Sequence, residues 1–380
     1  MRPDKNFATA LVLMLAASTG ACSAATSQGA PLPPRAIGHV FIIVLENKGY
    51  ASTFGAKADG RSPYLSRDLP GMGALLTQYY AIGHSSLPNY IAMVSGQSPN
   101  PETQKNCPVF LDWKGATTPD ADGQVAGTGC VYPDTIRTIG NQLQDAGGTW
   151  KAYLEDMGND PKRDGGRHCA HPAIGAVDRT PSSTAEDQYA TRHNPFMYHH
   201  AIIDDVSNCQ ARVVALDELS ADLRTEATTP NYAFVVPNLC HDGHDTNCPT
   251  GEPGGLVSAD PFLRQWVGRI LASRAFRKDG LLIVTFDEAA RRDTAACCNE
   301  PTGPNTRLPG KRGPGGGRVG AVLISPFIRP GTVSDVPYNH YSMLKSVEQL
   351  LGLDYLGFAG QAGLVPFGPD VFTRPTGSAR

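Results

Sequence analysis

Five short apolar runs, each bounded by polar turn residues, constrain the fold more than any other feature of this sequence. They lie at 40–45, 150–154, 232–236, 281–286 and 319–324. Runs of this length are typical of parallel strands, which are covered on both faces and therefore lack a polar side. Segments with apolar residues at helical spacing fall between them, at about 87–95, 134–146, 260–275 and 341–351. This alternation predicts an α/β fold, with a mainly parallel central sheet and helices on both faces.

The composition is that of a soluble globular protein. The 380 residues are 41% hydrophobic and 18% charged, with a formal net charge of −3. This charge argues against a nucleic-acid partner, because such proteins neutralise phosphates with an excess of basic residues. We expect a single domain over 37–375. The stretches 97–130, 156–200 and 289–318 read as long loops, which in compact domains are usually functional or stapled.

The first 25 residues read as an export signal. Arg2 and Lys5 precede an apolar stretch at 8–17 that is too short to span a bilayer. Cys22 follows a Thr-Gly-Ala sequence that resembles a bacterial lipoprotein cleavage site, and cleavage near Ala25 by an ordinary signal peptidase is the alternative. Residues 26–36 would then form a Pro-rich tether. We expect a secreted, periplasmic or cell-envelope protein, with membrane contact only through an N-terminal lipid anchor.

Eight further cysteines follow Cys22, and an even number in an exported chain predicts disulfides. Cys107 with Cys130 and Cys240 with Cys248 are the local candidates, although the sequence leaves the full connectivity open. The paired Cys-x-x-Cys or His spacing of a structural zinc site is missing from the sequence.

Polar side chains follow three of the predicted strands. Glu46-Asn47 comes after the first run, Asp287-Glu288 after the fourth, and a cluster at 241–245 with two His and two Asp after the third. Ligands of open α/β sheets bind at the carboxyl ends of the strands, and polar groups there are costly unless paired or metal-bound. Carboxylates, an amide and imidazoles at one edge suit a divalent cation such as Mg, Ca, Mn, Zn or Fe.

The segment from His84 to Tyr90 reads as a helix start with a hydroxyl at its tip. Ser85 or Ser86 can act as N-cap, and Pro88 falls in the first turn, where its missing N–H costs nothing. The N-terminus of a helix presents free N–H groups and a positive dipole end to an anion. A serine at this place therefore suits a nucleophile that attacks phosphate.

Taken in order, six motifs resemble the bacterial phosphoesterase family, a branch of the alkaline phosphatase superfamily that includes secreted acid phosphatases and C-type phospholipases. The motifs are Leu45-Glu46-Asn47, Ser86-Leu87-Pro88-Asn89-Tyr90, Arg192-His193-Asn194-Pro195, Asp242-Gly243-His244-Asp245, Thr285-Phe286-Asp287-Glu288 and His340-Tyr341-Ser342. The resemblance covers about residues 38 to 356. It is closer to the compact acid phosphatases, because no long C-terminal extension follows the last motif.

The resemblance implies a role for each matching position. Ser86 would be the nucleophile, and the ligands of one divalent metal ion would be Glu46, Asn47, Ser86, Asp287 and Glu288. Asn89 would contact a phosphate oxygen, and His244 or His340 would protonate the leaving alcohol. The substrate would also be bound by Arg192, His193, Asp242 and Asp245. Other branches of the superfamily have Asp or His at the position of Glu288, which puts a second metal ion in doubt.

The expected activity is hydrolysis of phosphate monoesters through a phosphoserine, with a small phosphorylated molecule or a phospholipid as substrate. A phosphodiesterase of the C-type phospholipase kind on the same fold is the first alternative. An exported protein that binds phosphorylated ligands without turnover is the second. A Gly-x-Ser-x-Gly serine hydrolase is disfavoured, because the sequence around Ser86 lacks the second glycine.

Overall fold

The computed structural model describes Met1, residues 36–58 and residues 60–373. The predicted export signal, the lipidation candidate Cys22 and nearly all of the predicted tether lie outside these residues. Eight strands form one sheet in the order β11-β2-β10-β9-β1-β8-β6-β7. They are β1 His39–Leu45, β2 Ala74–Leu76, β6 Trp150–Leu154, β7 Val213–Ala215, β8 Tyr232–Val236, β9 Gly280–Phe286, β10 Ala321–Ile324 and β11 Thr332–Ser334. Two small ribbons pair β3 Tyr79–Tyr80 with β12 Tyr338–Asn339, and β4 Lys114–Gly115 with β5 Gly127–Thr128.

All five predicted strands are confirmed, as β1, β6, β8, β9 and β10. Every residue of β1, β8 and β9 is buried, which explains why these strands read as unbroken apolar runs. The sheet is mainly parallel, but β10 runs antiparallel to both β9 and β2. Three strands of only three residues each, β2, β7 and β11, complete the sheet and were not expected from the sequence.

The four predicted helices are also present, and the longest is displaced from its expected range. They are α3 Ser86–Ser95, α4 Ile139–Asp145, α9 Gly255–Ala272 and α11 His340–Leu351. Helix α9 ends before 275 because Ser273 leaves the helical conformation and caps a new helix, α10 Arg274–Asp279, by accepting from the N–H of Phe276. The shorter helices are α1 Tyr50–Thr53, α2 Leu69–Met72, α5 Pro161–Asp164, α6 His200–Ile203, α7 Val206–Arg212 and α8 Leu219–Asp222.

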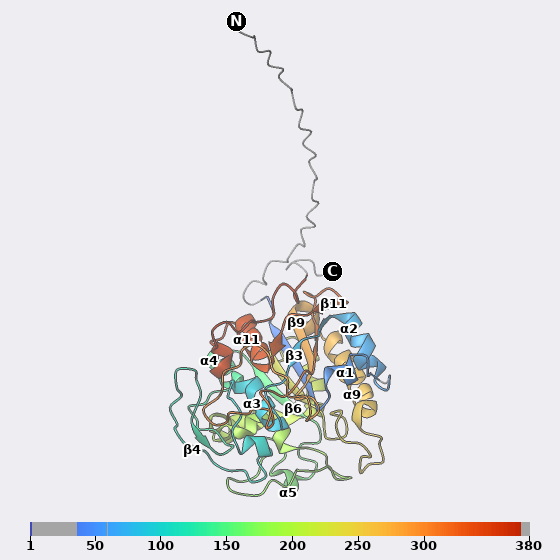
Figure 1. Ribbon diagram of the computed structural model, residues 1–380. Helices are drawn as coiled ribbons and strands as arrows, with labels where there is room; N and C mark the ends of the chain where they lie inside the picture. Colours follow the sequence, from blue (N-terminus) through green and yellow to red (C-terminus); the bar gives the residue numbers. More distant parts are fainter. Residues whose placement is uncertain (2–35, 59, 374–380) are drawn as a thin grey trace.

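The helices cover both faces of the sheet. In Figure 1, α3, α4 and α11 lie on one side of the strands, whereas α1, α2 and α9 lie on the other. The predicted fold class is therefore confirmed. None of the helices in the described part of the chain is both long and apolar enough to cross a membrane.

In the described residues, four disulfides bond all eight cysteines. Both predicted pairs, Cys107–Cys130 and Cys240–Cys248, are bonded, and the remaining bonds are Cys169–Cys209 and Cys297–Cys298. In a chain with this many loop residues, such crosslinks restrict the unfolded state and hold loops in place.

Candidate active site

The site begins at the edge of the sheet where the parallel strands β1 and β9 end. Glu46 directly follows β1 and Asp287 directly follows β9. Asn47 joins them, because its backbone N–H donates to Asp287 Oδ1 at 2.9 Å and its side-chain Nδ2 donates to Glu46 Oε2 at 2.6 Å. Asn47 has a φ of 55°, a left-handed conformation that Asn tolerates better than most residues. This turn places both carboxyl groups at one point.

Ser86 is the first residue of α3, and its hydroxyl lies in this cluster. Its Oγ donates to Glu46 Oε2 at 2.8 Å, and the side chain is buried. Ser85 occupies the N-cap position, but its hydroxyl does not cap the helix: it donates to the Gln104 carbonyl and accepts from Lys311 Nζ. The geometry thus distinguishes the two neighbouring serines, and only Ser86 contacts the carboxylate cluster.

His193 and Asp242 complete the cluster from two loops. His193 Nε2 lies 3.2 Å from Glu46 Oε1, and His193 Nδ1 lies 4.0 Å from Asp242 Oδ2. One ligand atom from each of Glu46, His193 and Asp242 falls within 4.8 Å of the others. The ring of Tyr90 stacks on His193 with centroids 5.3 Å apart, which fixes the plane of the imidazole. The sequence placed His193 and Asp242 against the substrate, whereas the structure places them among the potential metal ligands.

The cluster contains buried polar atoms without hydrogen-bond partners. These atoms are Glu46 Oε1, Asp242 Oδ2, Asp287 Oδ2 and both ring nitrogens of His193. Buried polar atoms are rarely left unpaired, because each costs its full desolvation free energy. Oxygen and imidazole nitrogen atoms that converge in this way are the donor set of a divalent cation, so the residues present fit the metal ion that the sequence predicts.

The pKa values in the cluster are shifted strongly by its burial. Burial, and then the neighbouring Asp287, raise the pKa of Glu46 well above its ordinary value. Burial and Glu46 do the same to Asp242, and burial and Glu288 to Asp287. Burial, followed by Arg192 and His244, lowers the pKa of His193 well below its ordinary value, so its imidazole is neutral and able to act as a ligand. Three acids held so close together favour a cation between them.

Ser86 and Glu46 form part of the wall of a cavity of about 740 Å³. The cavity is rich in cationic side chains: Lys48, Lys105, Arg192 and Arg291 all line it. A phosphate group carries negative charge on several oxygens, and Arg and Lys bind it through charge-assisted hydrogen bonds. The cavity is therefore complementary to a phosphorylated ligand with its phosphorus near Ser86.

Glu288, which the sequence predicts as a metal ligand, lines this cavity, and its carboxylate contacts a histidine. Glu288 Oε2 contacts His84 Nδ1, and His84 Nε2 lies 2.9 Å from the carbonyl oxygen of Asp293. The His84 ring and the Glu288 carboxylate are both buried. The sequence reasoning assigned no role to His84, although it stands only two residues before Ser86.

Two predicted catalytic residues do not reach the cavity. Asn89 is fully buried, and its Oδ1 accepts from the N–H groups of Ile82 and Gly83 while its Nδ2 donates to the carbonyls of Gly83 and Ser85. This amide has no donor left for a phosphate oxygen. Its predicted contact is therefore wrong in this geometry, and Asn89 instead fixes the loop that carries Ser85 to the start of α3.

His340 is also a positioning residue rather than a lining residue. It is fully buried, its Nε2 donates to the backbone carbonyl of Asp287 at 2.6 Å, and its Nδ1 accepts from Tyr79 Oη at 3.1 Å. Burial lowers the pKa of His340 to about 4. With both nitrogens engaged and no opening to the cavity, it cannot protonate a leaving group, so this part of the expectation is corrected.

His244 is the histidine that lines the cavity and remains partly exposed. Its Nδ1 lies 2.9 Å from Asp245 Oδ1, and this contact is the main cause of the lowered pKa of Asp245. Asp245, which the sequence predicts against the substrate, therefore contacts His244 and does not itself line the cavity. The loop is tied to the sheet, because the N–H of Glu46 donates to the carbonyl of Asp242 at 2.7 Å.

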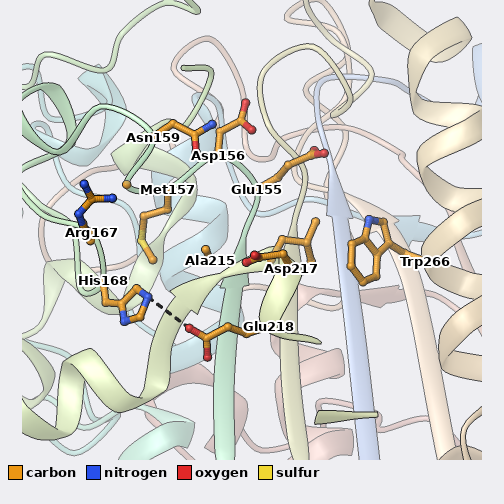
Figure 2. Close-up of a pocket in the computed structure, with 12 residues that line it drawn as sticks. Glu155, Asp156, Met157, Asn159, Arg167, His168, Ala215, Asp217, Glu218 and Trp266 are labelled. Atoms are coloured by element: carbon orange, nitrogen blue, oxygen red, sulfur yellow. Dashed lines mark ion pairs between the residues drawn. The ribbon is translucent and has the colours of Figure 1, made fainter. Parts of the chain in front are cut away.

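A second cavity, of about 500 Å³, opens beyond the ends of β6 and β7 and has the opposite character (Figure 2). Carboxylates from Glu155, Asp156, Asp217 and Glu218 line it, and Glu218 pairs with His168. Burial and Glu155 raise the pKa of Asp156 to about 6. This acidic lining disfavours a phosphate, so the basic cavity at Ser86 is the better candidate for the site.

Three cationic side chains that line the cavity were not predicted from the sequence. Lys48, Lys105 and Arg291 approach the cavity from turns and loops, and no periodic pattern separates them from solvated surface charges. Their neighbours carried a weak signal, because Lys48 follows Asn47 and Arg291 lies three residues after Glu288.

The comparisons with known proteins identify the family of the chain. The model of the Phosphoesterase family matches residues 65–354, and the chain therefore belongs to that family. A probable acid phosphatase of Kluyveromyces lactis is 26% identical over 83% of this chain and 59% of its own length. A phosphatidylinositol-3-phosphatase of Mycobacterium tuberculosis is 25% identical over 92% of this chain and 88% of its own length.

The chain spans somewhat more than half the length of the fungal acid phosphatases that it matches. A solved protein of the alkaline phosphatase superfamily from Vibrio parahaemolyticus aligns with 86% of this chain and 71% of its own chain, at 16% identity and a TM-score of 0.45.

Proposed function

We propose that this protein is a phosphoric ester hydrolase, an exported metal-dependent acid phosphatase that cleaves phosphate monoesters through a phosphoserine at Ser86. One observation carries the proposal. The Ser86 hydroxyl is held by Glu46 at the wall of a basic cavity, beside buried carboxylate and imidazole atoms that lack partners. The four disulfides support export, because such bonds persist in oxidising compartments.

In the proposed reaction, Ser86 Oγ gives its proton to Glu46 Oε2, which already accepts its hydrogen bond, and attacks the phosphorus. The Oγ–P bond forms, and the bond from phosphorus to the alcohol oxygen breaks. His244 gives a proton to the leaving oxygen. Because Asp245 engages Nδ1, the proton leaves from Nε2. Water then attacks the phosphorus from the opposite side and gives a proton to His244 Nε2, which restores the histidine. The Oγ–P bond breaks, Ser86 Oγ takes its proton back from Glu46, and phosphate departs.

The remaining residues hold these groups in place. Glu46 orients the Ser86 hydroxyl, Asn47 orients Glu46 and Asp287, and Arg192 binds the phosphate oxygens. A divalent cation held by Glu46, Asp242, Asp287 and His193 would favour the deprotonated form of Ser86 and stabilise negative charge on the phosphate. Glu288, held by His84, would add a further carboxylate beside the cation.

The substrate class includes lipid phosphates as well as small soluble monoesters. The Mycobacterium relative, matched over most of its length, is named for a phosphatidylinositol phosphate, whereas the fungal relatives are named acid phosphatases. The volume of the cavity admits either a phosphorylated lipid head group or a small soluble phosphate monoester.

The test is a comparison of Ser86→Ala with Ser85→Ala, with p-nitrophenyl phosphate as substrate. We expect Ser86→Ala to lose at least roughly three orders of magnitude in kcat and Ser85→Ala to keep most activity. Acid-quenched reactions analysed by mass spectrometry should show the phosphate on the Ser86 peptide. If Ser85→Ala loses its activity and Ser86→Ala keeps it, Ser85 and not Ser86 is the nucleophile.

The same assay separates the alternatives. Faster turnover of bis-p-nitrophenyl phosphate or phosphatidylcholine than of the monoester would indicate a phosphodiesterase of the C-type phospholipase kind. Tight binding of monoesters without any turnover by the metal-loaded protein would indicate a binding protein.

A further inference from the structure

Exposed apolar side chains border the basic cavity on one side. Val177, Pro108 and Pro181 line the cavity and are exposed at the surface, and Ile174 lies on the same loop. The exposed fractions are 64% for Val177 and 44% for Ile174, so both belong to the large apolar residues that the described chain leaves exposed. We call these four residues the apolar rim. Apolar side chains that gather beside a polar site often mark a surface that binds a partner.

The apolar rim is held outward by backbone hydrogen bonds. The N–H of Phe110 donates to the Ala176 carbonyl, and the N–H of Gly175 donates to the Phe110 carbonyl, each at 2.8 Å. Val109 and Val177 form an antiparallel bridge, and the Cys107–Cys130 disulfide precedes Pro108 directly. The loop is therefore fixed by its neighbours, so Ile174 and Val177 stay at the surface instead of folding into the core.

Cationic side chains stand beside the apolar rim. Arg179 is exposed two residues after Val177, and Lys105 lines the cavity close to Pro108, where it also pairs with Glu102. Arg192 lies deeper in the same cavity. Apolar side chains flanked by Lys and Arg are the combination that binds anionic bilayers, because the former enter the head-group region while the latter attract acidic lipids.

We propose that the apolar rim docks on an anionic lipid bilayer and that the cavity then receives a phosphate borne by a lipid head group. The proposal rests on the proposed function and narrows its substrate class. Docking in this orientation brings the mouth of the cavity to the plane of the head groups. The acyl chains can then stay in the bilayer while the phosphate reaches Ser86.

The test uses Ile174→Asp, which changes the apolar rim without touching the cavity, and Val333→Asp as a matched control. Val333 is 64% exposed on β11, at the opposite end of the molecule from β4 and α5 (Figure 1). Binding is measured by sedimentation with phosphatidylcholine vesicles, with or without phosphatidylserine. Turnover is measured on phosphatidylinositol 3-phosphate in these vesicles and on soluble p-nitrophenyl phosphate.

We expect Ile174→Asp to weaken binding to the anionic vesicles by about tenfold, because an apolar side chain no longer enters the interface. Lipid turnover should fall in parallel, while the kcat/KM for the soluble monoester stays unchanged. Arg179→Gln should weaken binding to the phosphatidylserine vesicles and leave binding to phosphatidylcholine alone unaffected. Val333→Asp should behave as the wild type.

Equal vesicle binding by the wild type and Ile174→Asp would overturn the docking proposal. So would equal losses in Ile174→Asp and Val333→Asp, or a matching loss of soluble turnover in Ile174→Asp. If the wild type hydrolyses soluble monoesters but does not bind vesicles, the docking proposal is refuted and the proposed function is not. Ile174-dependent vesicle binding without any turnover refutes the proposed function and leaves docking supported.

Discussion

Replacing Glu300 with glutamine should stabilise the protein at alkaline pH. Glu300 Oε1 accepts from Asn339 Nδ2 at 2.7 Å, whereas Oε2 is buried without a partner. Glu300 as a whole residue is partly exposed, but its Oε2 atom is enclosed. Burial raises the pKa of Glu300 to about 8. Glutamine keeps the acceptor for Asn339 and removes the ionisable group.

The sign and size of the effect follow from linkage. Between the ordinary glutamate pKa of about 4.3 and the raised value, the folded state binds the proton and the unfolded state does not. The free energy of unfolding therefore falls as pH rises through this window. A shift of this size corresponds to about 5 kcal/mol at most, and partial exposure reduces it, so we expect about 2–5 kcal/mol between pH 4.5 and 9.

Urea unfolding of the wild type and Glu300→Gln at pH 5, 7 and 9 measures this difference. The two proteins should be similar at pH 5, and the variant should be more stable at pH 9. Glu186→Gln, a change at an exposed glutamate, is the matched control and should leave the pH dependence unaltered. Parallel pH profiles for the wild type and Glu300→Gln would refute the reasoning, because the buried carboxyl would then ionise without cost.

Three further predictions concern the site. Asn89→Ala should lower the free energy of unfolding, measured in urea, by about 2–5 kcal/mol, because two buried N–H groups lose their acceptor. A variant of unchanged stability that has lost its activity would contradict this reasoning and indicate that Asn89 contacts the phosphate. His340→Ala should lower kcat about 10- to 100-fold, because the Asp287 backbone loses its hydrogen bond, and substrates with poor and good leaving groups should be slowed equally. His244→Ala removes the proton donor, so it should slow phenyl phosphate, which has the poorer leaving group, more than p-nitrophenyl phosphate. Removing the metal ion with a chelator should lower the melting temperature, and adding a divalent ion at a hundred times its Kd should raise the free energy of unfolding by about 2.7 kcal/mol. Asp242→Asn should largely abolish this gain. A melting curve that the chelator leaves unchanged would count against a metal ion in this cluster.

The central strands could be predicted because full burial leaves an unbroken apolar run. The edge strands β2, β7 and β11 could not, because three residues carry no periodicity and their pairing depends on partners far along the chain. The antiparallel course of β10 follows from the long loop that precedes it, whose path the sequence does not encode locally.

The site residues likewise include some that could be predicted from the sequence and some that could not. Glu46, Asn47 and Asp287 follow buried strands, so the sheet's geometry brought them together as predicted. His193 comes from the loop at 156–200, where no rule of chain geometry assigns it to the metal cluster instead of the substrate. Asn89 matched a motif, yet a motif does not reveal that four backbone groups already occupy its amide.

The attachment of Glu46 and Asp287 to β1 and β9 has a consequence for how the protein opens. Every residue of these two strands is buried, so their amide hydrogens should exchange only through global unfolding. The apolar rim lies on a loop, whose amides should exchange through cheaper local openings. Partial unfolding can therefore disturb the surface that meets the lipid while the carboxylates stay in register. A protein of this design should retain turnover of small monoesters under mild denaturing conditions that already abolish turnover on vesicles.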